Sequence, residues 1–324
     1  MPQALGGRQL KVRIFRRILL GSLGFLALVW LGLAAYALWP GEPEIPARQL
    51  ATADDRFVDV EGLVLRYREY GARGPGRPDL ILIHGFSNSL QTFRLLVPLL
   101  EPHFHVVTVD APGFGLSAKP TDHDYSNASQ AAAISRFATA LGFERYVIGG
   151  HSMGGTLSAY IGSTDPRVSG VVLMNPGIIT TGVPPISKYM GFPLTRIMAK
   201  TFGGRDFREK FLKQSYLKPE LITAQVMDDM MLAPRSEGYV AGTAAMMGQY
   251  ETGDEPRATS QIRVPTLIAW GMQDKSKPKG ELEAVQALIP GSTVARIEPS
   301  GHYVHEEQPQ AVAAAMIAQI PNWL

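Results

Sequence analysis

Short apolar runs that alternate with helical patterns constrain the fold of this chain more than any other feature. Short buried strands separated by helices are typical of a mainly parallel sheet that is covered on both faces. We therefore predict an α/β fold with a mainly parallel sheet of eight strands, the first two forming a hairpin around Glu61-Gly62. The predicted strands are residues 57–60, 63–67, 80–83, 105–109, 145–148, 168–173, 266–270 and 294–297. The helical patterns between them include residues 90–100, 126–141 and 154–161.

The alternation is interrupted between residues 178 and 262 and resumes at Val264. The interruption is rich in Met, Lys and aromatic residues and has no convincing strand, so we predict a helical cap (178–262) inserted over the sheet. The core then consists of residues 57–177 and 263–324. Methionine is flexible and suits an adaptable apolar lining, although methionines at helical spacing also pack ordinary cores. The methionines concerned are Met190, Met198, Met227, Met230, Met231, Met246 and Met247.

Residues 18–39 carry no charge and are long enough to cross a bilayer as a helix. Five basic residues precede this run, whereas the first acidic residue is Glu42. Because basic residues favour the cytoplasmic side, we predict a cytoplasmic tail (1–17), a single-pass anchor (18–39) in the cell (inner) membrane, and the rest of the chain on its outer, periplasmic side. Cleavage of a signal peptide near Ala37, which yields a secreted or periplasmic protein, is the alternative. Residues 40–56 are predicted to be a stiff, polar linker.

The charge balance and the absence of cysteine exclude several classes of function. Without the five N-terminal cations, 26 basic residues stand against 29 acidic ones, and no basic patch recurs that would indicate a nucleic-acid partner. The chain has no cysteine, which excludes disulfides, thiolate catalysis and cysteine-ligated metals. His103 and His105 have a spacing that could present two metal ligands, but no carboxylate cluster accompanies them, so we predict no metal site.

The segment Gly150-His151-Ser152-Met153-Gly154 matches the pattern G-x-S-x-G. It follows an apolar strand and precedes a helical run, the context in which a sharp turn presents a serine hydroxyl to a reactant. Glycines at both ends of the motif lack the β-carbons that would collide in so tight a bend. We therefore predict that Ser152 is a nucleophile.

Two further polar residues follow predicted strands, and both suit a partner role for Ser152. Asp274 lies in a turn after the strand at 266–270, and His302 lies in a loop after the strand at 294–297. Loops at the carboxyl ends of parallel strands share one edge of the sheet, so the three side chains can converge there. The chain order serine, aspartate, histidine is one of the known orders of such triads. We predict that His302 is the base and that Asp274 orients it.

Three more segments carry a resemblance to a known family: residues 82–86, 110–117 and 301–309. With the G-x-S-x-G motif, they make the sequence resemble the α/β-hydrolase superfamily, in its serine esterase, lipase and C–C hydrolase branch. The resemblance covers residues 57–177 and 262–324 and implies the α/β-hydrolase fold. It also implies that the backbone N–H groups of Phe86 and Met153 form an oxyanion hole and that Asp110 stabilises a loop. The residues expected to support these motifs are His84, Gly85, Gly150, His151 and Gly154.

The resemblance implies hydrolysis of carboxylic esters through an acyl-enzyme, without a metal, nucleotide or organic cofactor. By analogy with monoacylglycerol-lipase-like relatives, the expected substrates are lipid-like or acylglycerol esters. Cleavage of a C–C bond in a vinylogous diketone uses the same residue types and is an alternative; a non-catalytic binding protein with the same fold is a more distant one. The superfamily's dehalogenases and epoxide hydrolases carry aspartate at the position of Ser152, which disfavours those reactions. Residues 174–177 hold no carboxylate, so Asp274 is the better candidate for the acid.

Overall fold

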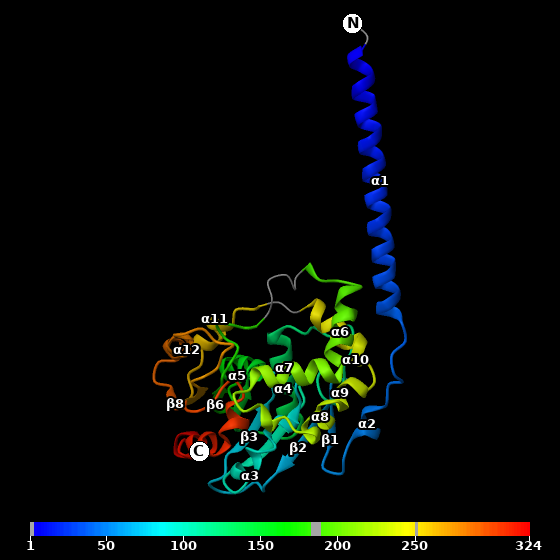
Figure 1. Ribbon diagram of the computed structural model, residues 1–324. Helices are drawn as coiled ribbons and strands as arrows, with labels where there is room; N and C mark the ends of the chain where they lie inside the picture. The colour runs from blue at the N-terminus through cyan, green and yellow to red at the C-terminus, as the bar shows by residue number, and fades with distance from the viewer. Residues whose placement is uncertain (1–2, 183–188, 250–251) are drawn as a thin grey trace.

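An eight-stranded sheet forms the centre of the fold (Figure 1). The computed structural model describes residues 3–182, 189–249 and 252–324, and parts of the predicted basic tail and of the predicted cap lie outside these ranges. The strand order is β1-β2-β4-β3-β5-β6-β7-β8, in which β2 is antiparallel to both neighbours and the other pairs are parallel. The strands are β1 (Arg56–Val60), β2 (Leu63–Tyr70), β3 (Asp79–Ile83), β4 (His105–Val109), β5 (Tyr146–His151), β6 (Val168–Met174), β7 (Thr266–Gly271) and β8 (Thr293–Ile297). The predicted α/β fold, with its mainly parallel sheet of eight strands, is confirmed.

Helices cover both faces of the sheet, because its parallel strands are apolar on both sides. Strands β4, β5, β6 and β7 are buried along their whole length. One face packs against α4 (Asn127–Ala140), α5 (Met153–Thr164) and α12 (Glu281–Leu288). The other face packs against η1 (Leu90–Phe93), α3 (Val97–Leu100), α14 (Pro309–Ile317) and α15 (Ile320–Trp323). The short helices α11 (Glu255–Ser260) and α13 (Val304–Glu307) complete the core.

The helical pattern predicted at residues 90–100 corresponds to two short elements, η1 and α3. Pro98 stands in the first turn of α3, where a missing N–H and a fixed φ are tolerated. Deeper in a continuous helix, the same proline would remove a hydrogen bond and collide with the preceding turn. The chain therefore starts a new helix at Val97. The helices predicted at 126–141 and 154–161 correspond to α4 and α5.

Between β6 and β7, the described residues form helices and no strand. Before α11 these are α6 (Leu194–Gly203), α7 (Arg205–Ser215), η3 (Pro219–Leu221), α8 (Ala224–Met230), α9 (Leu232–Arg235) and α10 (Tyr239–Gly248). They form a layer over the carboxyl edge of the sheet, which we call the cap. The cap has a small core of its own that includes Leu212, Met227 and Met230.

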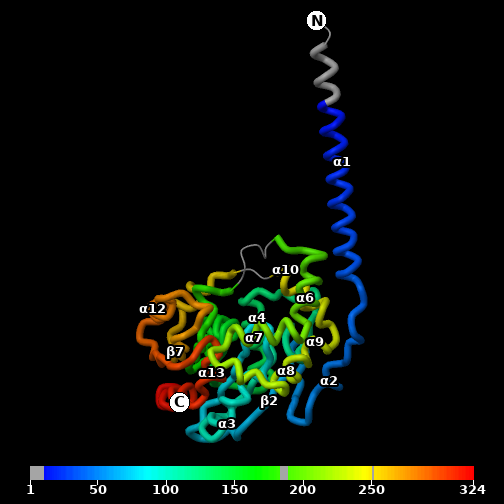
Figure 2. Tube along the Cα trace, viewed as in Figure 1, coloured from blue at the N-terminus to red at the C-terminus, as the bar shows by residue number. Residues whose placement is uncertain are grey.

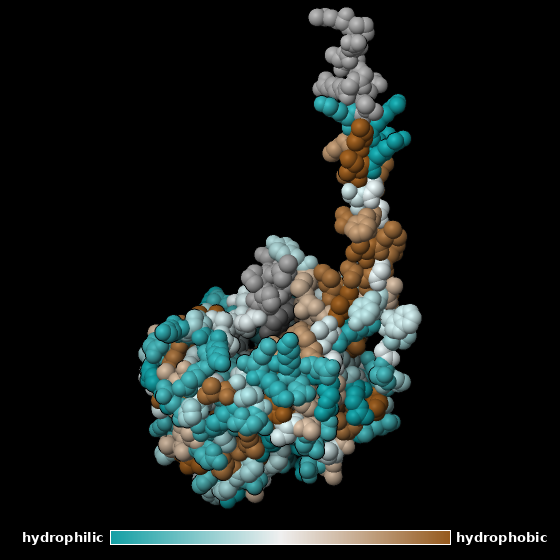
Figure 3. Space-filling view, in the orientation of Figure 1, coloured by the Kyte–Doolittle hydropathy of each residue, from teal (hydrophilic) through white to brown (hydrophobic). Residues whose placement is uncertain are grey.

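The N-terminal helix α1 (Gln3–Leu38) begins earlier than the predicted anchor and takes in most of the predicted basic tail. Its segment Lys11–Leu38 is long and apolar enough to cross a membrane, a property that retained anchors share with signal sequences. Most of the helix projects away from the body (Figure 2), and its apolar side chains are exposed there (Figure 3). Only its C-terminal end packs against α6, where Ala34 and Ala37 are buried.

The linker at residues 40–56 lies against the body instead of standing clear of it as a spacer. Ile45 pairs with Ser236 in an isolated β-bridge, and the carboxylate of Glu44 accepts a hydrogen bond from the cap backbone. After the short α2 (Ala47–Leu50), the carboxylate of Asp55 is buried against two arginines of β2. Polar side chains that would suit a solvated spacer thus bond to the cap and to the sheet.

Candidate active site

The turn between β5 and α5 holds Ser152 in a strained conformation. Ser152 has φ 53° and ψ −115°, in a region that residues with a side chain rarely adopt. A β-carbon on Gly150 would lie 2.2 Å from the backbone of Gly154, and a β-carbon on Gly154 would lie 2.1 Å from the carbonyl oxygen of Ile83. Both glycines of the motif are therefore required by the close packing of this turn.

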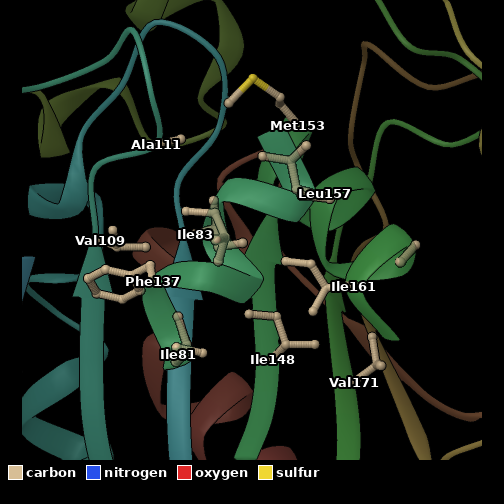
Figure 4. Close-up of a cluster of buried hydrophobic side chains, with 14 of the residues drawn as sticks. Ile81, Ile83, Val109, Ala111, Phe137, Ile148, Met153, Leu157, Ile161 and Val171 are labelled. Atoms are coloured by element: carbon tan, nitrogen blue, oxygen red, sulfur yellow. The ribbon is translucent and has the colours of Figure 1, made fainter. Parts of the chain in front are cut away.

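Helix α5 fixes this turn on the sheet. Met153, Leu157 and Ile161 recur every fourth residue and lie on the helix face that packs against the sheet (Figure 4). On the sheet side, Ile83 and Ile148 belong to the same buried cluster. Interiors are close-packed, so the helix cannot shift without opening this core. Ser152 is thereby held at the carboxyl edge of β5.

A cavity of about 360 Å³ lies between this edge and the cap, and Ser152 and His302 both line it. A cavity of this size suits a small organic molecule. The cap side of the wall is mainly apolar and aromatic. The other lining residues are Gly85, Phe86, His151, Thr180, Thr181, Gly182, Met190, Met198, Phe202, Phe211, Ser215, Met247, Ser276, Lys277 and Tyr303.

Asp274 is hydrogen-bonded to His302, as predicted for a residue that orients the base. Oδ2 of Asp274 is 2.7 Å from Nδ1 of His302, so the ring donates through Nδ1 and Nε2 is left to accept a proton. Burial acts to raise the pKa of Asp274, but hydrogen bonds from His302 and Ser276 outweigh it and lower that pKa to about 2. The carboxylate is therefore ionised at neutral pH and can stabilise a positive charge on the imidazole.

Two residues that the sequence did not lead us to predict complete the surroundings of Asp274. The side-chain amide of Asn175 donates to Oδ2 of Asp274 (2.8 Å), and the hydroxyl of Ser276 donates to Oδ1 (2.6 Å). The backbone N–H of Gly271 fixes Asn175 by donating to its amide oxygen (2.9 Å). A serine two residues after an aspartate is a common local partner and could have been suspected. Asn175 is 99 residues away from Asp274 along the chain, and no local signal indicates it.

The loop that carries His302 is held by Glu307. This buried carboxylate accepts hydrogen bonds from the backbone N–H of Gly301 and from the hydroxyl of Ser300 (3.0 Å). It also accepts one from the backbone N–H of Leu217, which belongs to the cap (2.5 Å). One side chain therefore positions the histidine loop and ties it to the cap.

Comparison with known proteins identifies the family of this chain. A model of the α/β hydrolase fold family matches residues 78–309. The chain belongs to that family. It is 26% identical to the uncharacterized hydrolase YugF of Bacillus subtilis, over 81% of this chain and 96% of that protein. It is 27% identical to Lipase 1 of Psychrobacter immobilis, over 80% of this chain and 78% of that protein.

The fold is also similar to the crystal structure of a membrane phospholipase A. The TM-score is 0.65 and the identity 23%, with 98% of this chain and 99% of that chain covered. The family expected from the sequence is thus confirmed, and hydrolase chemistry is supported for this chain. The identity of the substrate does not follow from fold likeness.

In this hydrolase, two buried histidines support the loops around Ser152. Nδ1 of His84 donates to the carbonyl of Gly85 (2.7 Å), and its Nε2 accepts from the N–H of Ala111 (3.1 Å). Nε2 of His151 donates to the carbonyl of His302 (2.9 Å). Burial lowers the pKa of both rings, so they are neutral and act as fixed hydrogen-bond partners.

The predicted oxyanion-hole residues are close to Ser152 in the chain or in the cavity. Met153 directly follows Ser152 as the first residue of α5, and Phe86 lines the cavity in the loop after β3. The next residue, Ser87, has a φ of 59°, and its carbonyl accepts a hydrogen bond from Arg208 of α7 (3.0 Å). The part of these residues in an oxyanion hole stays a prediction.

Arg208 connects the cap to that loop, although the sequence analysis did not single it out. The side chain is buried and also donates to the carbonyl of Phe202 (2.5 Å) and to the hydroxyl of Tyr239 (2.8 Å). All three of its acceptors are neutral. Burying a guanidinium is costly, and these three hydrogen bonds offset part of that cost: one joins the cap to the loop and two lie within the cap.

Asp110 holds the 110–117 loop, as expected from the family resemblance. Its carboxylate accepts hydrogen bonds from the backbone N–H groups of Leu90 (2.7 Å) and Leu116 (2.8 Å), and it forms an ion pair with Arg66 (3.2 Å). A β-carbon on Gly115 would overlap this carboxylate. Asp110 is therefore a structural residue of the loop.

The cavity thus brings Ser152 and His302 together with Gly85, Phe86 and His151, and Asp274 is bonded to His302 from behind. Among the described residues, no group of three or more histidines and carboxylates could hold a metal ion. The catalytic roles assigned from the sequence to Ser152, His302 and Asp274 stay predictions.

Proposed function

We propose that this α/β hydrolase cleaves carboxylic esters through a covalent acyl-enzyme, with Ser152 as nucleophile, His302 as base and Asp274 as the acid that orients the base. The observation that carries the proposal is the cavity shared by Ser152 and His302, with Asp274 2.7 Å behind the histidine ring. The strained backbone of Ser152 adds support, because strain of this kind clusters at functional sites.

The reaction has two halves. In the first, Oγ of Ser152 attacks the ester carbonyl while Nε2 of His302 takes its proton, and the charge of Asp274 stabilises the imidazolium. The N–H groups of Phe86 and Met153 stabilise the oxyanion, and His302 gives its proton to the leaving alcohol. In the second, water loses a proton to His302 and attacks the acyl-enzyme, and Ser152 recovers its proton as the acid leaves.

The wall of the cavity favours a flexible apolar acyl chain. Its cap side is formed largely by Met190, Met198, Phe202, Phe211 and Met247. Methionine adapts its shape to an irregular hydrocarbon, and aromatic rings supply apolar area. We therefore infer lipid-like or acylglycerol esters as substrates. The similarity to a lipase and to a membrane phospholipase A supports the same class.

We also infer that α1 is retained as an anchor. Nζ of Lys200 donates to the carbonyls of Tyr36 and Trp39 (2.7 Å each), and Nε of Arg196 donates to that of Ala37 (3.3 Å). Cations at a helix C-terminus satisfy its free carbonyls and interact favourably with its dipole. Cleavage after Ala37 would remove the carbonyls of Tyr36 and Ala37 and leave only that of Trp39. With the basic residues in the cytoplasm, the catalytic domain lies on the outer side of the membrane.

Hydrolysis of p-nitrophenyl esters from acetate to palmitate, by the full-length chain in detergent, tests the proposal. We expect turnover that rises toward medium or long acyl chains and that falls by at least about 1,000-fold in Ser152→Ala. A fluorophosphonate is expected to label the wild type and not the variant.

The other outcomes are distinct. Neither hydrolysis nor labelling would refute the serine hydrolase proposal. Labelling without hydrolysis of any ester would replace ester cleavage with the C–C bond alternative. Hydrolysis confined to acetate would keep the chemistry and overturn the lipid-like substrate.

A further inference from the structure

Large apolar side chains are exposed on the cap beside the cavity. They are Ile179 (43% exposed), Tyr189 (76%), Phe192 (46%) and Leu194 (47%), and we call them the cap rim. Single exposed apolar residues are ordinary on protein surfaces. These four, however, lie in two stretches that also contribute lining residues to the cavity, at 180–182 and at 190 and 198. The rim therefore borders the substrate site.

The rim is continuous with α1. The rings of Trp30 and Phe192 meet edge to face with their centroids 6.0 Å apart. Farther along α1, Ala34 and Ala37 are buried where the helix packs against α6. Figure 3 shows the apolar surface of α1 continuing onto the adjoining part of the cap. The level of Phe192 along the helix axis is thus set at Trp30.

That level places Phe192 within the depth of a bilayer. Residues 18–38 of α1 carry no charge, and at about 1.5 Å per residue they span about 32 Å. The hydrocarbon core of a bilayer is about 30 Å thick, so it takes up nearly the whole segment. Trp30 lies about 12 Å before Leu38 on the same scale. The cap at Phe192 is therefore below the level at which α1 leaves the membrane.

The alternative placement is unfavourable. Sliding α1 outward until the rim is in water would draw Arg16 and Arg17 into the hydrocarbon, and charged side chains there are expensive. Lowering the rim into the membrane instead removes exposed apolar side chains from water, which is favourable. The cost of burying the two arginines and the gain from removing apolar side chains from water both favour a rim that lies in the membrane.

We propose that the cap rim sits in the near leaflet of the bilayer that α1 spans, so that the cavity of Ser152 takes its substrate from the lipid phase. The partner of this surface is a phospholipid bilayer. The inference rests on the proposed retention of α1 and deepens the proposed ester hydrolysis by naming the phase from which the ester enters.

The depth of the rim can be measured without any reference to catalysis. Because the chain has no cysteine, Ile179→Cys and Leu194→Cys each provide one site for an NBD label in the full-length chain. The matched control is Leu95→Cys, which is 37% exposed and lies between η1 and α3, at the end of the body away from α1 (Figure 1). In phosphatidylcholine vesicles that contain brominated lipid, we expect blue-shifted, quenched emission from the two rim sites and aqueous emission from the control. Aqueous emission from the rim would overturn the proposal.

Activity tests the route of entry. The double variant Ile179→Ser/Leu194→Ser is compared with Leu95→Ser on p-nitrophenyl butyrate in water and on 1-oleoylglycerol in phosphatidylcholine vesicles. We expect the rim variant to stay within about twofold of wild type on the soluble ester and to lose about tenfold on the vesicle substrate, because two exposed apolar side chains lose their contact with lipid.

Two results would contradict the route. An equal loss of activity on both substrates would show that the rim residues stabilise the fold of the cap and do not contact lipid. A change of oligomer size in detergent, without a vesicle-specific loss, would assign it to contact with a second copy of the chain. If the wild type hydrolyses neither ester, the proposed function is refuted instead. The NBD emission still tests the depth of the rim, because it does not depend on catalysis.

Discussion

The two walls of the cavity are built by different means. The sheet wall places Ser152, His302 and Asp274 by backbone contacts that leave no room for a β-carbon and by a carboxylate bonded from three sides. The cap wall is made of flexible methionines and of phenylalanines. Bond-making needs reacting atoms at a set distance, whereas holding an acyl chain needs apolar volume. The division of labour between a rigid wall and an adaptable one follows from these two requirements.

Replacing Asp274 beside the site and Asp228 in the cap is expected to give the largest difference in activity. Asp274→Asn should lower kcat by about 10,000-fold, because the amide favours the wrong tautomer of His302 and cannot stabilise its positive charge. In the cap, Asp228 forms an exposed ion pair with Arg205 (2.6 Å). Asp228→Asn is expected to stay within about twofold. The measurement is kcat on the preferred p-nitrophenyl ester, and a milder effect at Asp274 would remove it from the triad.

One glycine in the turn at Ser152 and one in the cap test the difference in packing. Gly154→Ala forces a β-carbon against the backbone of Ile83 and is expected to lower the free energy of unfolding by about 3 kcal/mol and to abolish activity. Gly248→Ala, at the end of α10, meets nothing closer than 3.9 Å and is expected to raise stability by about 0.5 kcal/mol. Denaturant unfolding monitored by circular dichroism measures both. Similar losses in the two variants would contradict the contrast.

Within the cap, a buried methionine is expected to affect stability, and a methionine that lines the cavity is expected to affect the acyl-length preference. Met227 is 1% exposed in the small cap core, so Met227→Ala should cost about 3 kcal/mol of unfolding free energy and leave the acyl-length preference unchanged. Met198 lines the cavity, so Met198→Ala should cost about 1 kcal/mol and shift the preference toward longer esters. Thermal unfolding and the p-nitrophenyl ester series test the pair. A larger loss of stability in Met198→Ala, with a changed ester preference in Met227→Ala, would contradict this division between the cavity wall and the core of the cap.

Arg208 joins the two walls, and its replacement sharpens the comparison. Lysine keeps the charge but cannot reach three acceptors at once, so Arg208→Lys is expected to lower kcat/KM by about tenfold through the loop at Ser87, about the loss of one hydrogen bond to a charged group. Arg205→Lys, at an exposed neighbouring position in α7, is the control. Unchanged kcat/KM in Arg208→Lys would show that the loop holds its shape without the cap.

The last expected effect concerns the pH dependence of stability. Burial lowers the pKa of His305 to about 3, so the folded chain keeps this ring neutral while the unfolded chain takes up a proton below about pH 6.5. Stability is therefore fully present above that pH and falls toward pH 3, by about 1.4 kcal/mol per pH unit for this one proton. His305→Gln should reduce the slope by that amount, whereas His103→Gln, at an exposed site, should not. An unchanged slope in the first variant would contradict the buried neutral ring.

The sequence predicted the sheet wall better than the cap wall, for a physical reason. Ser152, Asp274 and His302 each follow a strand at the carboxyl edge, so a local pattern marks them. Asn175 and Arg208 act through contacts with residues far away in the chain, which no local pattern records.

The linker shows the same limit. Its polar, proline-rich start is typical of a spacer, but Ile45 pairs with Ser236 in the cap, and composition does not indicate such a partner. The helical pattern at 90–100 is divided into two elements for a local reason, because Pro98 can begin a helical turn but cannot continue one. Long-range bonds and single breaker residues therefore account for what the sequence did not reveal.

The contact between α1 and α6 bears on how the protein is handled in the laboratory. Trimming the chain at Gly41 to obtain a water-soluble domain would uncover the alanine-covered face of α6 and leave Arg196 and Lys200 without the carbonyls that they bond. The shortened protein would then expose an apolar patch close to the active-site cavity. Aggregation or detergent binding at this patch would change the measured activity and would resemble weak catalysis or inhibition.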